Sequence, residues 1–582
     1  MRAKQKTLRE RVFYPMLGTA TIAVAIEILS LLTDNIIVGH VVGETGVAGI
    51  NLVAPVFAFC AFLSGAICVG VSFRYSDAIG RFEEERAGQL FGMSVLLSAG
   101  VGLVMFLAAL LFEGLYFDVL SPSGAVRAAG ESYFRYIRLN MLVYPGFVLL
   151  AEMVYNDGDT GLCNVSYAVQ MAGNVGLSIL LCMRMGTGGA SLGTLIGTAA
   201  GLCVLLLHFF KKTNGLKPRL FFSCQELAFF FRFGFTDAGM YLCWSILFYL
   251  LNGFMIRRFG DGTLPVMAVV TGFFELTVIF DGVGQAMKPL VSVYFAEQNH
   301  IGVLKTMKIT LRCALAEGIA AAAAVLLLAD VMPLAFNIRD PATMAQSAQA
   351  LRIIAPSMVA ISILYLYSSY YLNVGQLGLS VWLMLWKDLL SILPLSVLLG
   401  LAFGLRGVWT GILLAPFLTL LIWRLTVRFR FVGEEFPLML ERDRSLADFD
   451  LCLRQEEIMA VRREAEDFLR ARGASDDAIV GAKLLVEDLS QIVMARNPDP
   501  EKVFAEWTLR TGEASLLMIY RDNGAVMDLS DPDARIASFR SFILSSYMES
   551  LETRKHLLTT GMNRTVFQLP YDRKQEKERP TE

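Results

Sequence analysis

Long apolar segments recur along the first three quarters of this chain of 582 residues. They lie at about residues 12–39, 48–75, 89–117, 133–155, 162–183 and 189–210, and then at 227–256, 264–295, 304–336, 351–372, 377–401 and 407–427. Each reaches the roughly 20 residues that a helix needs to cross a bilayer. The pattern predicts a polytopic α-helical membrane protein with about twelve transmembrane helices in two six-helix bundles.

Charged residues are concentrated at the end of the chain. Of 51 basic and 53 acidic residues, 21 and 27 lie between Glu441 and Glu582. The change near residues 430–445 predicts the main domain boundary. We expect an N-terminal six-helix transporter lobe at 1–215, a second six-helix lobe at 216–431 and a soluble α+β domain at 432–582. The net charge of −2 does not indicate nucleic-acid binding.

Basic clusters predict the orientation of the helices. They lie at residues 2–11, 74–86, 211–219, 305–308 and 424–430, and the loop after the first apolar segment has none. Cytoplasmic loops carry an excess of lysine and arginine. We therefore expect a multi-pass protein of the plasma membrane with both termini in the cytoplasm. The loop with Arg127, Arg135 and Arg138 is the main exception.

The two halves of the membrane region resemble each other. GAICVGVSFRYSDAIGRFEEER begins at Gly65, and GQAMKPLVSVYFAEQNHIGVLK begins at Gly284, so that Tyr75 aligns with Tyr294. An even number of helices per half makes the repeats parallel. Parallel repeats are typical of transporters that bind substrate between the halves.

Two acids lie in the first apolar segment. Glu27 and Asp34 are seven residues apart, which places them on one face of a helix. Carboxylates at membrane depth are usually retained for function, so this face is suited to binding a proton or a small cation. Alternatively, a neighbouring hydroxyl holds Glu27 and Asp34 marks the helix end. Glu275 is the acid that we favour in the second half, and pairing with a lysine such as Lys288 is the alternative.

Several motifs resemble the multidrug and toxic compound extrusion (MATE) transporters. They are Pro15 with LTDNIIVG at 32–39, VYNDGDTG at 154–161, Asn174, GTGGASLGTLIG at 186–197, GVGQAMKPLVS at 282–292, YYLNVGQ at 370–376 and FGLRGVWTG at 403–411. The resemblance implies exchange of drugs or amphiphilic organic cations for H⁺ or Na⁺. It also implies cation coupling at Asp34, with Asn174 nearby. Where many members carry an acid after this asparagine, this chain has Leu177 and Ser178.

The soluble tail shows an α+β pattern. We expect strands at 449–453, 514–520 and 565–569, and helices at 455–472 and 476–494. Three motifs follow in order: LLVEDLSQIVMARN at 484–497, IYRDNGAVMD at 519–528 and TTGMNRTVFQL at 559–569. They resemble the ATP-binding fold of histidine kinases, Hsp90-like ATPases and, most of all, anti-sigma-factor serine kinases.

That second resemblance implies roles for six residues of the tail. Glu487 would be the catalytic base, Gln491 stands at the Mg²⁺ position, Asp522 would bind adenine with Gly524 beside it, and Gly561 and Asn563 would cover the phosphates. The implied cofactors are ATP with Mg²⁺ in the tail and H⁺ or Na⁺ as the coupling ion. The alternative is a fold that binds no nucleotide and only contacts the transporter or a partner.

Together these features predict a secondary-active efflux antiporter, not an enzyme, with a nucleotide-binding regulatory tail. The expected partners are a small organic substrate, membrane lipid and a cytosolic regulatory protein at the tail. Two alternatives stay open: a flippase for lipid-linked oligosaccharide or polysaccharide, and a membrane-tethered serine kinase.

Overall fold

The computed structural model describes residues 7–81, 83–212, 214–430, 443–512, 515–526, 552–557 and 560–570. The chain divides into two compact units. One contains residues 23–281 and 314–425, and the other contains residues 1–22, 282–313 and 426–582. The second unit therefore combines the tail with the ends of helices from both halves of the membrane region.

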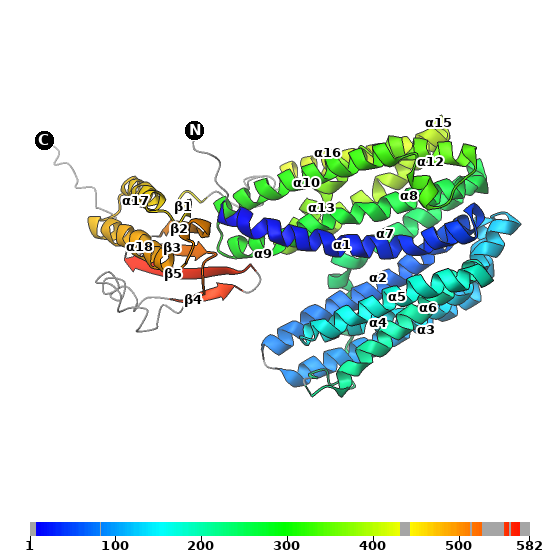
Figure 1. The fold of residues 1–582 in the computed structure, drawn as a ribbon, viewed down its shortest axis with the longest axis horizontal. Coiled ribbons are helices and arrows are strands. Elements are labelled where there is room, and N and C mark those ends of the chain that lie inside the picture. Colours follow the sequence, from blue (N-terminus) through cyan, green and yellow to red (C-terminus); the bar gives the residue numbers. More distant parts are fainter. Residues whose placement is uncertain are drawn as a thin grey trace. The chain divides into compact units, whose positions relative to one another are not determined.

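Every predicted apolar segment is helical (Figure 1). The helices of the first half are α1 (Leu8–Val41), α2 (Glu44–Gly80), α3 (Glu84–Leu120), α4 (Gly124–Asn156), α5 (Thr160–Met185) and α6 (Thr187–Leu206), the last continued by η1 (Leu207–Phe210). Ten helices in the described residues are long and apolar enough to cross a membrane, or eleven if one bent pair counts as a single span. The helical membrane fold is therefore confirmed, whereas the number twelve stays a prediction.

The second half begins with the uninterrupted α7 (Cys224–Phe259), but four of its later segments are interrupted. The first consists of η2 (Asp261–Thr263), α8 (Leu264–Thr277), η3 (Val278–Phe280) and α9 (Asp281–Ala296). The second consists of α10 (His300–Leu328) and α11 (Met332–Ala335), and the third of α12 (Pro341–Ile354) and α13 (Ser357–Asn373). The fourth consists of α14 (Leu377–Leu385), the π-helix η4 (Trp386–Leu390) and α15 (Ile392–Phe403). α16 (Leu405–Arg430) completes the set. The bend of 53° between α12 and α13 lies at Pro356, which cannot donate a helical hydrogen bond.

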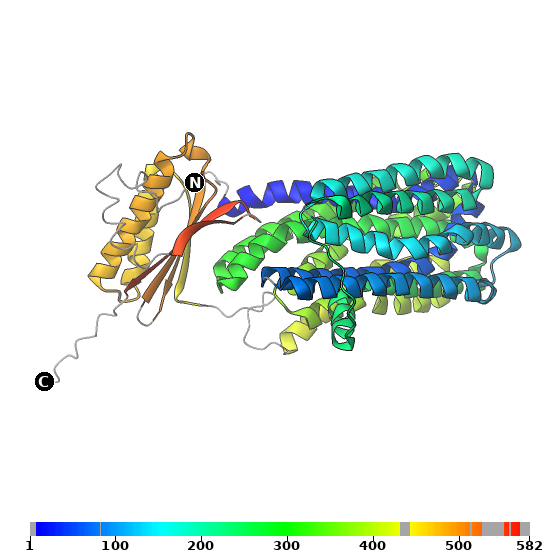
Figure 2. The same ribbon diagram turned by 90° about the horizontal axis from the view of Figure 1, so that it is seen from below.

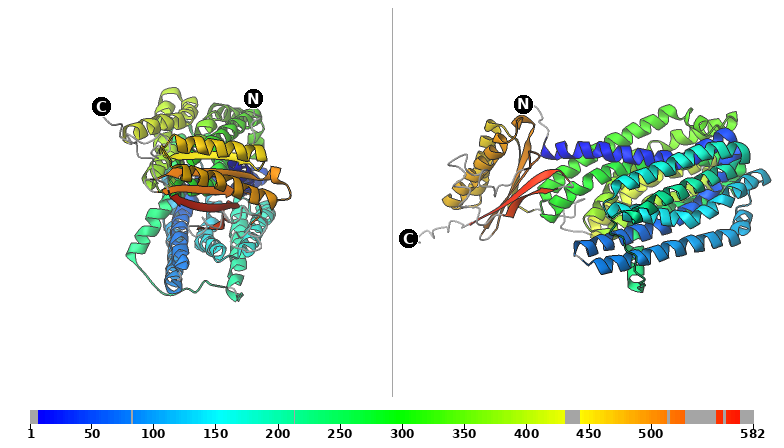
Figure 3. Two further views of the ribbon diagram at one scale, coloured as in Figure 1. Left: turned by 90° about the vertical axis from the view of Figure 1, so that its left-hand side faces the viewer. Right: turned by 60° about the horizontal axis from the view of Figure 1, so that its bottom comes forward.

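The tail is a two-layer α+β structure (Figure 2). Its antiparallel sheet has the order β1-β2-β3-β5-β4, with β1 (Leu446–Cys452), β2 (Phe504–Thr511), β3 (Ser515–Asp522), β4 (Glu552–Leu557) and β5 (Met562–Pro570). The helices α17 (Gln455–Arg470) and α18 (Asp476–Ala495) lie on one face of this sheet (Figure 3), and the short η5 (Pro500–Lys502) precedes β2. The predicted helices and strands are confirmed, but β2 and β4 were not predicted.

The two faces of the tail sheet differ in chemistry. Trp507, Met518 and Phe567 belong to the apolar face and form one core with α17 and α18. Because side chains alternate along a strand, the residues between them point to the other face. That face carries a row of charged residues in adjacent strands.

Candidate functional site

Asp34 lies inside α1, where two hydroxyl groups donate hydrogen bonds to its carboxylate. The Tyr133 hydroxyl of α4 donates to Oδ2 at 2.8 Å, and Thr194 Oγ1 of α6 donates to the same oxygen at 3.0 Å. A charged group at membrane depth costs about 2.5–3.5 kcal/mol on insertion scales. The two donors lower this cost, so three helices jointly stabilise one partly buried acid.

Asn174 of α5 joins the cluster through Thr194. Thr194 Oγ1 lies 3.2 Å from Asn174 Oδ1, and Ser178 Oγ donates to that amide oxygen at 3.0 Å. A hydroxyl carries one proton, so Thr194 donates fully to only one acceptor at a time. The structure thus places the predicted residues Asp34 and Asn174 around one shared donor.

Glycines of α6 bring Thr194 and Asn174 together. They stand at every fourth position, at residues 189, 193, 197 and 201. A Cβ added to Gly197 would lie 2.6 Å from the backbone nitrogen of Asn174 and 2.7 Å from the Gln170 carbonyl oxygen. Small residues at this spacing allow membrane helices to approach closely. The glycines of the motif at 186–197 therefore allow the backbones of α5 and α6 to pack closely.

The second predicted acid of the membrane region lies near the same tyrosine. Glu275 of α8 interacts electrostatically with the Tyr133 hydroxyl. Its Oε2 is buried and has no hydrogen-bond partner among the described residues. Of the two predicted acids, Asp34 is the one that Tyr133 contacts with a hydrogen bond. Glu27 is also on α1, but its side chain lies outside the described part of the chain.

Sequence reasoning missed Tyr133 and Thr194. Thr194 stands inside the glycine motif, where it is the polar residue between Gly193 and Gly197, so its position was a usable signal. Tyr133 begins a predicted apolar segment and had no such signal. The assembled group offers carboxylate, amide and hydroxyl oxygens, which suit either a proton or a small hard cation.

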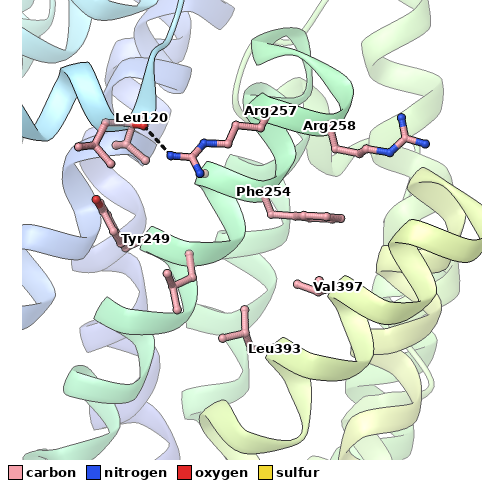
Figure 4. A pocket seen from close by; sticks show the side chains of 10 residues that line it. Leu120, Tyr249, Phe254, Arg257, Arg258, Leu393 and Val397 are labelled. Carbon is pink, nitrogen blue, oxygen red and sulfur yellow. Dashed lines mark hydrogen bonds between the residues drawn. The ribbon is translucent and has the colours of Figure 1, made fainter.

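A cavity of about 520 Å³ lies elsewhere, between α3, α7 and α15 (Figure 4). Tyr249, Phe254 and Leu393 are among its apolar walls, and Arg257 and Arg258 are its charged residues. Arg257 donates to the Val119 carbonyl oxygen at 3.1 Å. Two guanidinium groups repel an organic cation, so this cavity is unsuited to the expected substrate class.

In the tail, the predicted adenine residues lie together. Asp522 Oδ1 accepts hydrogen bonds from the Gly524 amide and from Asn563 Nδ2, both at 2.9 Å. Asn563 is the cross-strand partner of Asp522. Asn497, which was not predicted, accepts from the Ala525 amide at 2.9 Å and so joins the end of α18 to this group. Gly561 adopts φ 65°, a conformation that favours glycine.

Glu487 and Gln491, at the predicted catalytic and Mg²⁺ positions, are engaged in contacts with other side chains of the tail. Arg462 Nη1 lies 2.9 Å from Glu487 Oε2, and Gln491 Nε2 donates to Glu487 Oε1 at 3.4 Å. The Arg462 guanidinium already neutralises the Glu487 carboxylate, and the Gln491 amide turns its nitrogen toward that carboxylate. Glu487 and Gln491 as arranged do not fit a magnesium ion, so we derive no hydrolytic step from them.

Comparison with known families identifies the membrane region. Residues 20–183 and 238–395, more than half of the chain, match the family described as MatE. The chain belongs to the MatE family. Two relatives named multidrug export protein MepA, from Staphylococcus aureus strains bovine RF122 / ET3-1 and MRSA252, are 21% and 22% identical over 389 and 393 residues. Each match covers 66% of this chain and 85% of the relative.

Solved structures agree at the level of the fold. An inward-facing multidrug resistance MATE family transporter gives a TM-score of 0.64 at 20% identity, covering 69% of this chain and 94% of that one. An outward-facing MATE transporter gives 0.57 at 20% identity, covering 73% and 96%. A MOP superfamily transporter from Pyrococcus furiosus gives 0.58 at 19% identity, with the same coverage. With the family match, the membrane region of this chain is a multi-pass membrane transporter and not an enzyme.

The close approach of α5 and α6 can be tested with one methyl group. Gly197→Ala would press a Cβ against two backbone atoms that cannot turn away. We expect a loss of about 1–3 kcal/mol, as for other overpacked sites, seen as a lower melting temperature in detergent. Gly176→Ala on α5 is the control, because nothing lies within 4 Å of its added Cβ. Equal stability of the two variants would contradict the packing account.

Proposed function

We propose that this MatE transporter exports drugs or other amphiphilic organic cations across the plasma membrane in exchange for H⁺ or Na⁺. Asp34 is the proposed coupling residue. The observation that carries the proposal is its setting, in which a partly buried carboxylate shares the Thr194 hydroxyl with the Asn174 amide oxygen. The named activity of the MepA relatives, multidrug export, supports the same substrate class.

The cluster suggests how coupling would work. When Asp34 is ionised, Tyr133 and Thr194 both donate to it. When Asp34 takes a proton, its hydroxyl becomes a donor and Thr194 can turn toward Asn174 or the Ala190 carbonyl. A small cation would instead bind the same oxygens. Either event changes whether the Thr194 hydroxyl links α6 to α1 through Asp34, and this gives the ion a way to favour one conformation.

Replacing Asp34 with asparagine tests this role. Asp34→Asn keeps the size of the side chain and can still accept a hydrogen bond, but it cannot ionise. We expect normal expression and loss of energy-dependent efflux of a fluorescent cation from cells. Asp118→Asn is the matched control, because Asp118 is exposed and, among the described residues, pairs with Arg127 on the surface. Unchanged efflux by the Asp34 variant would exclude it as the coupling site.

We propose that both termini and the linker at 211–219 lie in the cytoplasm. The test uses a chain in which the exposed Cys203 and Cys224 are serine. A cysteine at Leu220, which is 90% exposed, should resist an impermeant maleimide in intact cells and react after permeabilisation. A cysteine at Ala342, also exposed, should react in intact cells. The opposite pattern would reverse the orientation.

We propose further that the tail binds adenine nucleotide as a regulatory ligand, without serving as an energy source. The buried Asp522 carboxylate with Gly524 and Asn563 beside it supports this. Calorimetry on the full chain should show ATP binding that Asp522→Ala abolishes and Asp467→Ala, at an exposed acid of α17, leaves unchanged. Glu487→Ala should preserve ion-driven transport. Absence of ATP binding by the folded parent chain would reject a nucleotide-binding tail.

A further inference from the structure

The polar face of the tail sheet carries charges in register. Asp450 of β1 pairs with Glu506 of β2, Glu506 with Arg521 of β3, and Arg521 with Arg564 of β5. In a two-layer domain the face opposite the helices is normally solvated. Here Glu506 and Arg521 are completely buried. This face must therefore be covered by another part of the same compact unit.

The polar face of the tail sheet contacts the end of α9, the turn that follows it and the start of α10. The Tyr294 hydroxyl donates to Glu506 Oε2 at 2.9 Å, and Asn299 Nδ2 donates to Thr508 Oγ1 at 3.2 Å. Glu297 accepts from both Arg521 and Arg564. Several further contacts of this kind hold the turn: Arg510 Nη2 donates to the Glu297 and Gln298 carbonyl oxygens, and Lys305 Nζ pairs with Asp448 and Asp450. The sheet is thus seated on the turn by many side chains.

The start of α1 contacts the polar face of the tail sheet through Arg9. Its Nη2 lies 2.6 Å from Asp448 Oδ2 and 2.8 Å from Glu506 Oε2, and its Nη1 lies 2.8 Å from Asp450 Oδ1. The guanidinium also lies 4.8 Å from the Tyr294 ring centroid. One guanidinium therefore fills a socket built by the tail and α9. The neighbouring Arg11 adds only a cation–π contact with Phe504, at 4.7 Å.

The charges of this socket depend on one another. Arg9 and Lys305 hold the pKa of Asp448 below its usual value, although burial alone would raise it. If Arg9 leaves, buried carboxylates lose their principal cation, which is unfavourable unless water enters. The docked and released states of Arg9 should therefore be two discrete states.

α1 belongs to the first half of the membrane region, and α9 and α10 belong to the second. In transporters built from repeats, the halves move relative to each other during transport. We propose that Arg9 is a latch. The tail stays seated on the α9–α10 turn, and Arg9 leaves its socket in each transport cycle, so that docking of Arg9 holds the transporter at rest. The expected effect of Arg9 docking on the rate of transport rests on the proposed transport function.

Cleavable cross-links test the latch. In the chain with Ser at 203 and 224, Arg11→Cys and Phe504→Cys are joined by a short bifunctional methanethiosulfonate. We expect ion-driven transport to fall roughly tenfold or more and to return when reductant cleaves the link. Gln298→Cys with Arg510→Cys is the matched control, since it links the tail to the turn at two positions that are not buried. Its cross-link should change transport by no more than about twofold.

Each other outcome overturns the proposal. Continued transport in the first cross-linked chain shows that α1 need not leave the socket. Loss of transport in both chains shows that the whole tail must leave the turn. Failure of the reagent to join positions 11 and 504 in a folded chain shows that α1 does not dock there.

A measurement without transport separates the latch from the proposed function. Spin labels at the exposed positions Arg11 and Lys502 report the distance between α1 and the tail. Asp448→Asn removes a carboxylate that Arg9 and Lys305 keep ionised in the socket, so the released population should rise about tenfold or more. Lys483→Gln, which alters an ion pair with Glu466 on the helical layer, is the control. Equal distance distributions in the two variants would reject the latch even if transport is never detected.

Discussion

A carboxylate at membrane depth is costly even when it is partly buried, and helices α1, α4 and α6 meet around one, Asp34. Asp34 is stable inside α1 because Tyr133 and Thr194 donate to it from two other helices. Thr194 also reaches Asn174 because α6 lies close against α5, and the glycine at 197 permits that approach. Small residues therefore set the separation of the helices, and this separation determines which oxygen atoms surround the acid.

The membrane fold was predictable because its signal is local. Apolar length alone located the helical segments of the membrane region. Breaks such as the one at Pro356 were visible in the sequence as proline but could not be assigned an angle. The partners of Asp34 could not be predicted, since Tyr133 and Thr194 are 99 and 160 residues away. Such contacts depend on helix packing, which no periodicity encodes.

The tail shows a different limit of sequence reasoning. In β2 the alternation of Ala505, Trp507 and Leu509 with polar residues was readable, yet it was not used. The same alternation predicts that Glu506 faces water. It is instead buried between Arg521 of the adjacent strand and Arg9, which is distant in sequence. A charged strand face signals solvent unless its counter-charges are known, and these come from α1 and the α9–α10 turn.

The central claim is that an ion gradient drives this transporter through the Asp34 cluster. Purified protein in liposomes, given an imposed H⁺ or Na⁺ gradient and a fluorescent organic cation, tests it most directly. The account predicts substrate movement against its gradient without ATP, driven by at least one of the two ions, and none after the gradient is collapsed. Transport that needs ATP, or that ignores both ion gradients, would contradict it.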